Sequence, residues 1–249
     1  MLRGIYASAS GMVAGASTQR IVSDNIANVN TPGHRARHAT LSPFGTLFLQ
    51  RTEGAASGGS RVGHTNAGAR ISGVHTSDEM GRLHPTGRPS DLGLDGPGFF
   101  VLEGDGGILL TRNGSFTVDG DGHLTLSGGH RLRSEAGLLR VGDGPFAVEG
   151  DGTVRSGDEV LGRIVVANPD PAALREDQSG HFRTDGPLDA AGDPADTAVL
   201  QGYLELSNAD MVEEMTRLMA VQRVYQANHT AFAVQDRTLD EALRLPEGV

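Results

Sequence analysis

The acidic turn at residues 119–123, Asp-Gly-Asp-Gly-His, is the stretch whose residue types come closest to a metal site. Calcium loops of the helix–loop–helix kind carry Gly at position 6 and Glu at position 12. Counted from Asp119, position 6 is Leu124 and position 12 is His130, so the pattern fails. Asp-Gly between short apolar runs is a strong hairpin signal, and we predict a hairpin turn here.

Two histidines, His34 and His38, have the four-residue spacing of metal ligands on one helix face. They follow Pro32-Gly33, a turn signal where a helix is not expected. No third ligand has a suitable spacing. We therefore predict no metal site at these histidines.

Catalytic motifs are missing from the sequence. The chain has no Cys and no G-x-S-x-G nucleophile motif. The glycines at 96–98 precede an expected strand rather than a helix, so they do not form a phosphate-binding loop. We predict no enzymatic activity and no cofactor, and a β-sandwich enzyme with a pocket of convergent acids stays as an alternative.

The composition excludes several classes of partner. The formal net charge is −10 over 249 residues, which disfavours nucleic acid. Without Cys, no disulfide framework is possible. No apolar run approaches the ~18 residues of a membrane span, and no cleavable signal peptide is expected. Charge is uneven, because five Arg and one Asp give residues 1–52 a net +4, whereas four Arg and eight acidic residues give 201–249 a net −4.

The two ends of the chain are predicted to be helical. Apolar residues recur every three or four positions over 2–30, among many small residues that permit close helix packing. Residues 203–245 contain neither Gly nor Pro and carry a second apolar stripe. Ser207 or Asp210 is expected to cap this helix, with Glu213 and Glu214 in its early turns.

The middle of the chain, about 40–200, is predicted to be β-structure. Short apolar runs alternate with turn signals, and Asp-Gly recurs at 105–106, 119–122, 143–144 and 151–152. Such spacing indicates an antiparallel sandwich or barrel. Aromatic residues are only 4% of the chain, so the core is expected to be aliphatic.

The predicted fold class is α+β, with a coiled-coil-like pair of terminal helices and a central antiparallel all-β domain. We expect an N-terminal helix of an axial core domain at 1–35, a linker or extended loop at 36–75, the β-domain at 76–200 and the C-terminal helix at 201–249. Such helices have little to bury alone, so they are expected to order by packing on neighbouring subunits.

Four separated stretches resemble the bacterial flagellar rod and hook protein family. They are "SDNIANVNTPGHRA" at 23–36, "DLGLDGPGFFVL" at 91–102, "LTRNGSFTVDGDGHL" at 110–124 and "LQGYLELSNADMVEEMTRLMAVQRVYQAN" at 200–228. His34 and Leu110 stand where the family usually has aromatic residues. The resemblance spans both ends and the middle in the right order.

The resemblance implies a structural subunit without catalysis. Members self-assemble into the axial drive shaft of the flagellar basal body, in the cell envelope, after leaving the cytosol unfolded through the flagellar export apparatus. Expected partners are copies of this chain and other rod and hook subunits, with no membrane insertion. The chain length fits the two larger rod subunits, and we favour the distal rod type over its neighbour at the junction.

The expected assembly interface combines the two helical stripes with the polar turn. It comprises Leu2, Ile5, Met12, Asn25, Ile26, Asn28, Asn30, Thr31, Pro32, Gly33, Asn208, Met215, Leu218, Gln222, Arg223, Tyr225, Asn228, Phe232 and Leu239. The alternative function is an envelope or adhesin-like binding module, with a β-domain on a coiled-coil stalk that forms a closed oligomer rather than an open filament.

Overall fold

The computed structural model describes residues 2–51, 60–66, 68–104, 107–142, 144–169, 174–177, 180–184 and 197–244. The chain divides into two compact units, each assembled from separate segments. We call Met1–Ala27, Ala36–Ser77 and Asp210–Val249 the helical unit. We call Asn28–Arg35 and Asp78–Ala209 the β unit.

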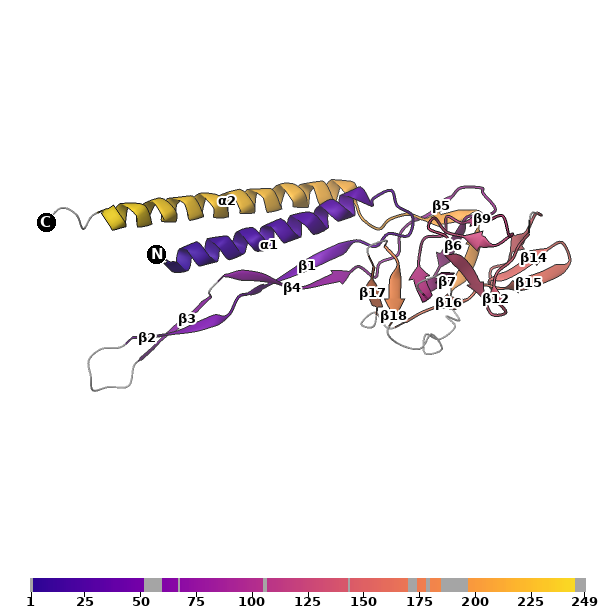
Figure 1. The fold of residues 1–249 in the computed structure, drawn as a ribbon, viewed down its shortest axis with the longest axis horizontal. Coiled ribbons are helices and arrows are strands. Elements are labelled where there is room, and N and C mark those ends of the chain that lie inside the picture. Colours follow the sequence, from indigo (N-terminus) through magenta and orange to yellow (C-terminus); the bar gives the residue numbers. More distant parts are fainter. Residues whose placement is uncertain are drawn as a thin grey trace. The chain divides into compact units, whose positions relative to one another are not determined.

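The helical unit consists of two antiparallel helices and a long β-hairpin (Figure 1). Helix α1 (Leu2–Ala27) packs against α2 (Met211–Arg244) and against strands β1 and β4. The hairpin pairs β1 (Arg37–Pro43) with β4 (Ala69–Thr76), and β2 (Thr46–Arg51) with β3 (Ser60–Asn66). The segment expected as a linker, 36–75, therefore contains four paired strands, and residues 52–59 and 67 of it lie outside the described residues.

Small residues set the approach of α1 to α2. A Cβ atom added to Gly11 would lie 2.8 Å from the side-chain nitrogen of Asn228, and one added to Gly15 would lie 3.7 Å from the ring of Tyr225. Ser8, Ala14 and Val22 of α1 are buried. The face that α1 buries is therefore its small-residue face, whereas Ile5 and Met12 of the expected apolar stripe are only half-buried.

The N-terminal end of α2 is defined by Asp210. Its Oδ1 accepts hydrogen bonds from the backbone N–H of Val212 at 2.8 Å and of Glu213 at 3.0 Å, which confirms the expected cap. The segment expected as the C-terminal helix, 201–249, also contains strand β20 (Tyr203–Glu205), paired with β5 (Leu83–Pro85), before the cap. Helix α1 ends at Ala27 rather than at 30, because the backbone then turns at Asn28–Thr31.

The β unit is built from antiparallel strands, as expected. Its main sheet has the order β17-β18-β8-β7-β11-β10-β9, and β12 and β16 pair with β11 and β7. The strands of this sheet are β7 (Phe99–Gly104), β8 (Gly107–Thr111), β9 (Thr117–Val118), β10 (Leu124–Thr125), β11 (Arg131–Ser134), β12 (Gly137–Leu138), β16 (Val166–Ala167), β17 (Leu174–Glu176) and β18 (Phe182–Thr184).

Smaller sheets complete the β unit. Strands β13 (Ala147–Val148), β14 (Thr153–Ser156) and β15 (Glu159–Arg163) form one, and β19 (Ala198–Gln201) pairs with β6 (Leu92–Asp95). The Asp-Gly turns at 119–122 and 151–152 join β9 to β10 and β13 to β14, as predicted. Those at 105–106 and 143–144 lie wholly or partly outside the described residues.

Both faces of β7 are buried, and they divide the core into two clusters. Phe100 and Leu102 belong to a large cluster that is mainly Leu and Val, which confirms the expected aliphatic core. Phe99 and Val101, on the opposite face, pack with Leu110. The alternation follows from the two-residue period of a strand. It places Phe99 beside the polar cluster described next.

Candidate assembly interface

A buried ion pair between Arg112 and Glu205 lies in the β unit. Arg112 Nη1 donates to Glu205 Oε2 at 3.0 Å, and Arg112 Nη2 donates to the carbonyl oxygen of Gly96 at 2.7 Å. The other oxygen of Glu205 accepts from the backbone N–H of Gly81 at 2.9 Å. Both side chains are almost fully buried. Both charges lose their hydration, so such a pair adds little net stability, whereas removing one partner would leave an uncompensated buried charge.

A second arginine joins this pair. Arg35 is buried, and its Nη2 lies 3.9 Å from Glu205 Oε1. The guanidinium carbons of Arg35 and Arg112 lie 5.7 and 5.5 Å from the ring centroid of Phe99, within cation–π distance. Burial lowers the pKa of Arg112, and the charge of Glu205 opposes that shift. We call Arg35, Phe99, Arg112 and Glu205 the buried arginine cluster.

Gly33 gives the polar turn its shape. Its φ of 70° lies in the left-handed region, which favours glycine. A Cβ atom here would collide with the backbone of Arg112 and Asn113. The N–H of Gly33 donates to the carbonyl oxygen of Glu205 at 2.8 Å. The Thr-Pro-Gly turn therefore packs directly against the backbone of Arg112 and Asn113, just after β8 ends at Thr111.

The buried arginine cluster brings residues of all four resembling stretches into contact. Each of them supplies one residue: Arg35, Phe99, Arg112 and Glu205. Our sequence-based interface omitted all four, although each lies within a recognised motif. No spacing in these motifs points to the contacts among the four residues, because each residue lies in a different stretch of the sequence.

Two residues of the expected interface have intrachain roles. Asn25 is fully buried, its Nδ2 donates to the carbonyl oxygen of Arg37 at 2.9 Å, and its Oδ1 accepts from the N–H of Arg37 at 3.0 Å. These bonds tie the last turn of α1 to the start of β1. Gly33 is buried against the backbone of Arg112 and Asn113. In this structure neither residue presents a side chain to a partner.

The remaining expected residues are at least partly accessible. Those exposed are Asn30, Thr31, Met215, Gln222, Arg223 and Tyr225. Those half-buried are Ile5, Met12, Ile26, Asn28, Pro32, Asn208, Leu218, Asn228, Phe232 and Leu239. Leu2 begins α1, and its side chain lies outside the described part. The Asn28 side chain accepts from Thr31 Oγ1, and Asn208 Nδ2 donates to the carbonyl oxygen of Glu79.

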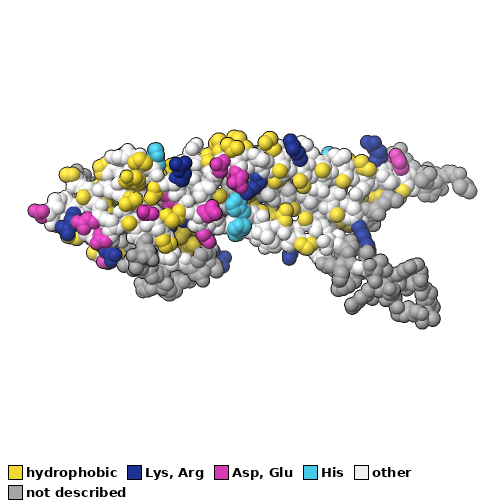
Figure 2. All heavy atoms as spheres, turned by 180° about the vertical axis from the view of Figure 1, so that it is seen from behind, with side chains coloured by type: hydrophobic (Ala, Val, Ile, Leu, Met, Phe, Trp, Pro, Cys, Tyr) yellow, Lys and Arg dark blue, Asp and Glu magenta, His cyan; other side chains and the backbone are white. Residues whose placement is uncertain are grey.

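Both helices expose apolar side chains that the sequence-based interface left out. On α2, Val212, Val224 and Leu243 are 73%, 57% and 74% exposed, and on α1, Tyr6 and Val13 are 70% and 69% exposed. Figure 2 shows hydrophobic side chains open on one face of the molecule, among scattered charges. An accessible apolar surface of this extent is typical of an interaction site.

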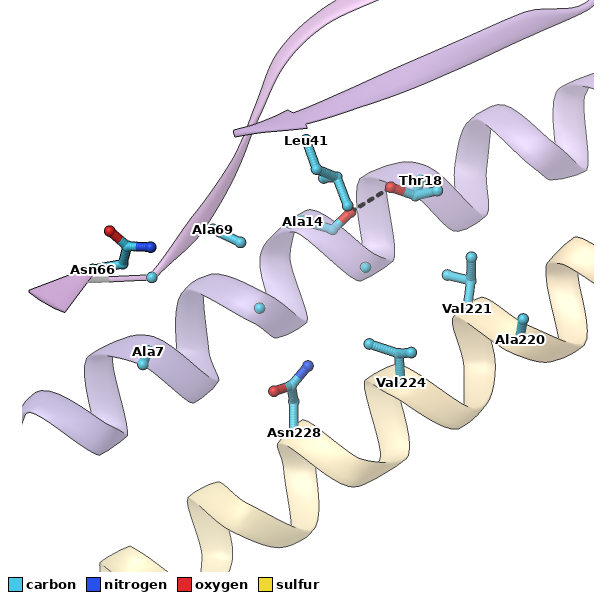
Figure 3. A pocket seen from close by; sticks show the side chains of 13 residues that line it. Ala7, Ala14, Thr18, Leu41, Asn66, Ala69, Ala220, Val221, Val224 and Asn228 are labelled. Carbon is cyan, nitrogen blue, oxygen red and sulfur yellow. Dashed lines mark hydrogen bonds between the residues drawn. The ribbon is translucent and has the colours of Figure 1, made fainter. Parts of the chain in front are cut away.

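A groove of about 520 Å³ runs along the helical unit. Figure 3 shows Val224 and Asn228 of α2 pointing toward α1, with Leu41 and Ala69 of the hairpin on the other side of α1. Gly11 and Gly15 form part of its wall. The groove is apolar because these residues are small or aliphatic, and it lacks converging acids of the kind that an enzymatic pocket needs.

The acidic turn at 119–123 holds the candidate metal ligands. Among the described residues, one group of three or more metal-type side chains lies close together, and it consists of Asp119, Asp121 and His123. Asp119 Oδ1 accepts from the N–H of Asp121 and of His123, and the His123 bond is the main cause of the lowered pKa of Asp119. Arg131 donates to both carboxylates. The carboxylates thus stabilise the hairpin turn that we predicted.

His34 and His38 lie in different units, and each has its own surroundings. His34 accepts the N–H of Asn208 on its carbonyl oxygen in the β unit. His38 lies on β1 in the helical unit and contacts Arg217. Neither of the two helices in the described part is long and apolar enough to cross a membrane.

Comparisons with known proteins cover nearly the whole chain. Three family models match: "Flagella basal body rod protein" over residues 5–35, "Flagellar hook protein FlgE/F/G D1 domain" over 93–181, and "Flagellar basal body rod FlgEFG protein C-terminal" over 200–245. These matched ranges contain all four residues of the buried arginine cluster.

Similar proteins that align with nearly the whole chain are named flagellar basal-body rod proteins. The flagellar basal-body rod protein FlgG of Bacillus subtilis is 30% identical over 98% of this chain and 99% of its own. The flagellar basal-body rod protein FlgF of Mesorhizobium japonicum is 30% identical over 98% of both chains. The FlgG of Borreliella burgdorferi is 29% identical over 98% of this chain. The chain therefore belongs to the bacterial flagellar basal-body rod and hook family, as a structural component of the rod.

Proposed function

We propose that this chain is a self-assembling subunit of the flagellar rod that polymerises into an open helical filament without catalysis. The observation that carries the proposal is the exposed apolar surface of α2, which extends from Met211 to Leu243. A helix that exposes Val, Met and Leu along its whole length gains stability when neighbours cover it. Fully burying one such side chain contributes about 1.5–3 kcal/mol.

Whether the subunits form a filament or a ring depends on which surfaces of neighbouring copies are in contact. A contact between two different faces, repeated without closing into a ring, generates a filament. The side of α2 that exposes Val212 and Met215, and the groove beside α1, whose lining contains neither residue, are two such faces on one chain. In this arrangement the helical units of neighbouring copies form a coiled-coil-like core around the filament axis.

Within the rod, we place the chain at the distal position. The chain length fits either of the two larger rod subunits, and the glycine-rich stretch at 96–100 and the C-terminal motif support the distal one. Neighbouring rod and hook subunits are then its partners, and the chain reaches them unfolded through the flagellar export apparatus. Family membership supports this route, and the absence of Cys is compatible with it.

The proposed interface keeps the accessible residues of α2 and of the polar turn. On α2 these are Met215, Leu218, Gln222 and Tyr225, to which the structure adds Val212 and Val224. In the turn, Asn30 and Thr31 are exposed, so their polar side chains are free to meet a neighbouring subunit.

The decisive experiment replaces an exposed apolar side chain by a charged one. In Val212→Glu, the fold should persist because the side chain is 73% exposed and does not line the groove beside α1, whereas assembly should fail because a buried unpaired carboxylate is costly. Motility and electron micrographs of isolated basal bodies report assembly, and circular dichroism reports the fold. Gln226→Glu adds the same charge at an exposed polar position of α2 and serves as the control.

Normal rods in cells that carry only the Val212→Glu chain would contradict the proposal. Sedimentation of the concentrated wild-type protein separates it from the adhesin-like alternative. A filament grows with concentration, whereas a closed oligomer stops at one mass. For the distal position, a strain without the chain should retain a shortened rod and lack the hook, and complete loss of the rod would place the chain closer to the membrane.

A further inference from the structure

A histidine–arginine contact joins the β-hairpin to the first turns of α2. Nδ1 of His38, on β1, lies 2.6 Å from Nη1 of Arg217. An arginine guanidinium only donates hydrogen bonds. Nδ1 of His38 must therefore act as the acceptor, which requires a neutral imidazole with its proton on Nε2. The contact as it stands is incompatible with a protonated His38.

The charged groups around His38 come from three packed elements. On β4, His75 is its direct partner in register, with ring centroids 5.5 Å apart. On α2, Arg217 also donates to Glu214 at 3.0 Å and to Glu213 at 2.9 Å. The preceding residue of β1, Arg37, pairs with Asp24 of α1 at 3.1 Å. Arg217 is thus held by two carboxylates and one imidazole.

Opposing influences act on the protonation of His38. Burial lowers its pKa most, and the charge of Arg217 lowers it further, as does His75 to a smaller degree. The carboxylates of Glu214 and Glu213 raise it, but the net pKa lies below the ordinary value. Protonation would remove the acceptor and set a second cation against Arg217 and beside His75.

We propose that the His38–Arg217 contact is an acid-sensitive switch, closed when His38 is neutral and open when His38 is protonated. In the closed state it fixes β1 and β4 against the N-terminal turns of α2. In the open state Arg217 keeps its two glutamates, and the hairpin loses its attachment to α2. This device regulates the helical unit whether or not the rod function proposed above is correct.

The direction of the pH dependence follows from the shift. A histidine whose pKa is lower in the folded state than in the unfolded chain binds more protons on unfolding. Its contribution to stability is complete above the unfolded pKa of about 6.5 and is lost as the pH falls through the folded value. The contact therefore weakens on acidification.

Hydrogen exchange in the full-length protein tests the switch. After correction for intrinsic exchange rates, amides of β1 and β4 should exchange several-fold faster at pH 5.5 than at pH 7.5. In His38→Asn, whose side-chain oxygen can accept from Arg217 but does not titrate, this acceleration should disappear. His229→Asn, at an exposed position of α2, should behave like wild type.

Two results would overturn the inference. The first is that the acid acceleration of exchange in β1 and β4 depends on the wrong histidine: it persists in His38→Asn and disappears only in His75→Asn. The other comes from wild-type protein and so does not depend on a variant that folds. If NMR titration gives His38 a pKa at or above 6.5, the neutral contact is not favoured and the switch does not exist.

Discussion

At the scale of single residues, Gly33 shows how one position fixes the chain path. Its left-handed φ and its contact with the backbone of Arg112 both exclude a side chain. The turn signal Pro-Gly predicted the bend from sequence, because turn chemistry is local. The partner of the turn was not predictable, because Arg112 and Asn113 reach it only through the fold.

Substituting Gly33 should separate the two constraints. Gly87 has the same φ of 70° but open space around it, so Gly87→Ala should cost only the backbone strain, about 1–2 kcal/mol. Gly33→Ala adds a collision with the backbone, which costs about 1–3 kcal/mol more. Urea unfolding of both variants gives the difference. Equal losses would mean that the close approach at Gly33 is not maintained in solution.

The buried arginine cluster marks the limit of sequence-based prediction at this scale. Arg112 and Glu205 are 93 residues apart, and neither has a spacing that indicates the other. The same holds for His38 and Arg217, 179 residues apart. Their pairing depends on strand register and helix packing, which local patterns do not encode.

At the scale of elements, the helices were predictable and their boundaries less so. Periodicity identified both helices, and Asp210 was recognised as a cap. The residues before this cap were grouped with the helix because 203–210 contains no Gly or Pro, but Tyr203–Glu205 forms strand β20. Pairing with β5 makes this segment a strand, and local sequence patterns do not encode that pairing because it is a tertiary contact.

Removing the cap should destabilise the first turn of α2. In Asp210→Ala, two backbone N–H groups lose their acceptor, and the expected loss is about 1 kcal/mol. Faster hydrogen exchange of residues 212–216 would report it. Asp236→Ala, at an exposed position inside the same helix, should change stability by less than about 0.5 kcal/mol. Similar effects of the two substitutions would show that Asp210 does not cap the helix.

The β-hairpin of the helical unit was the larger omission. Residues 36–75 looked like a linker because Gly, Ser and Thr are frequent and alternation is weak. Strands β1 and β4 nevertheless pair over seven residues each side, with an irregularity at Thr40/Leu41. They are held by α1, through bonds such as Ser10 Oγ accepting from the N–H of Ala69, so the stabilisation comes from outside the strand sequence.

At the scale of the whole molecule, the polar turn belongs to the β unit rather than to the helix before it. Asn28–Arg35 carries Gly33 and Arg35, both of which contact Glu205. The α+β class was confirmed. The division into units was harder to anticipate, because each unit is assembled from segments at distant positions in the sequence.

Two deletions test this division. Removal of residues 2–27 should abolish assembly but leave the β unit intact, because its own segment starts at Asn28. Removal of 2–35 also takes Gly33 and Arg35 away, so the β unit should become less stable. In a domain of this size each 1 kcal/mol lowers Tm by about 2–4 °C. Identical melting of the β unit in both proteins would show that the turn does not support it.

The position of Glu205 along the chain has a consequence for timing. Roughly four-fifths of the sequence precedes it, and a ribosome delivers the N-terminal part first. Arg35 and Arg112 are therefore synthesised long before the carboxylate that compensates for their enclosure. A guanidinium shut away from water without an opposite charge is strongly disfavoured. A chain that ends before Glu205 should therefore leave Arg35 and Arg112 uncompensated, and closure of the β unit has to wait for this carboxylate.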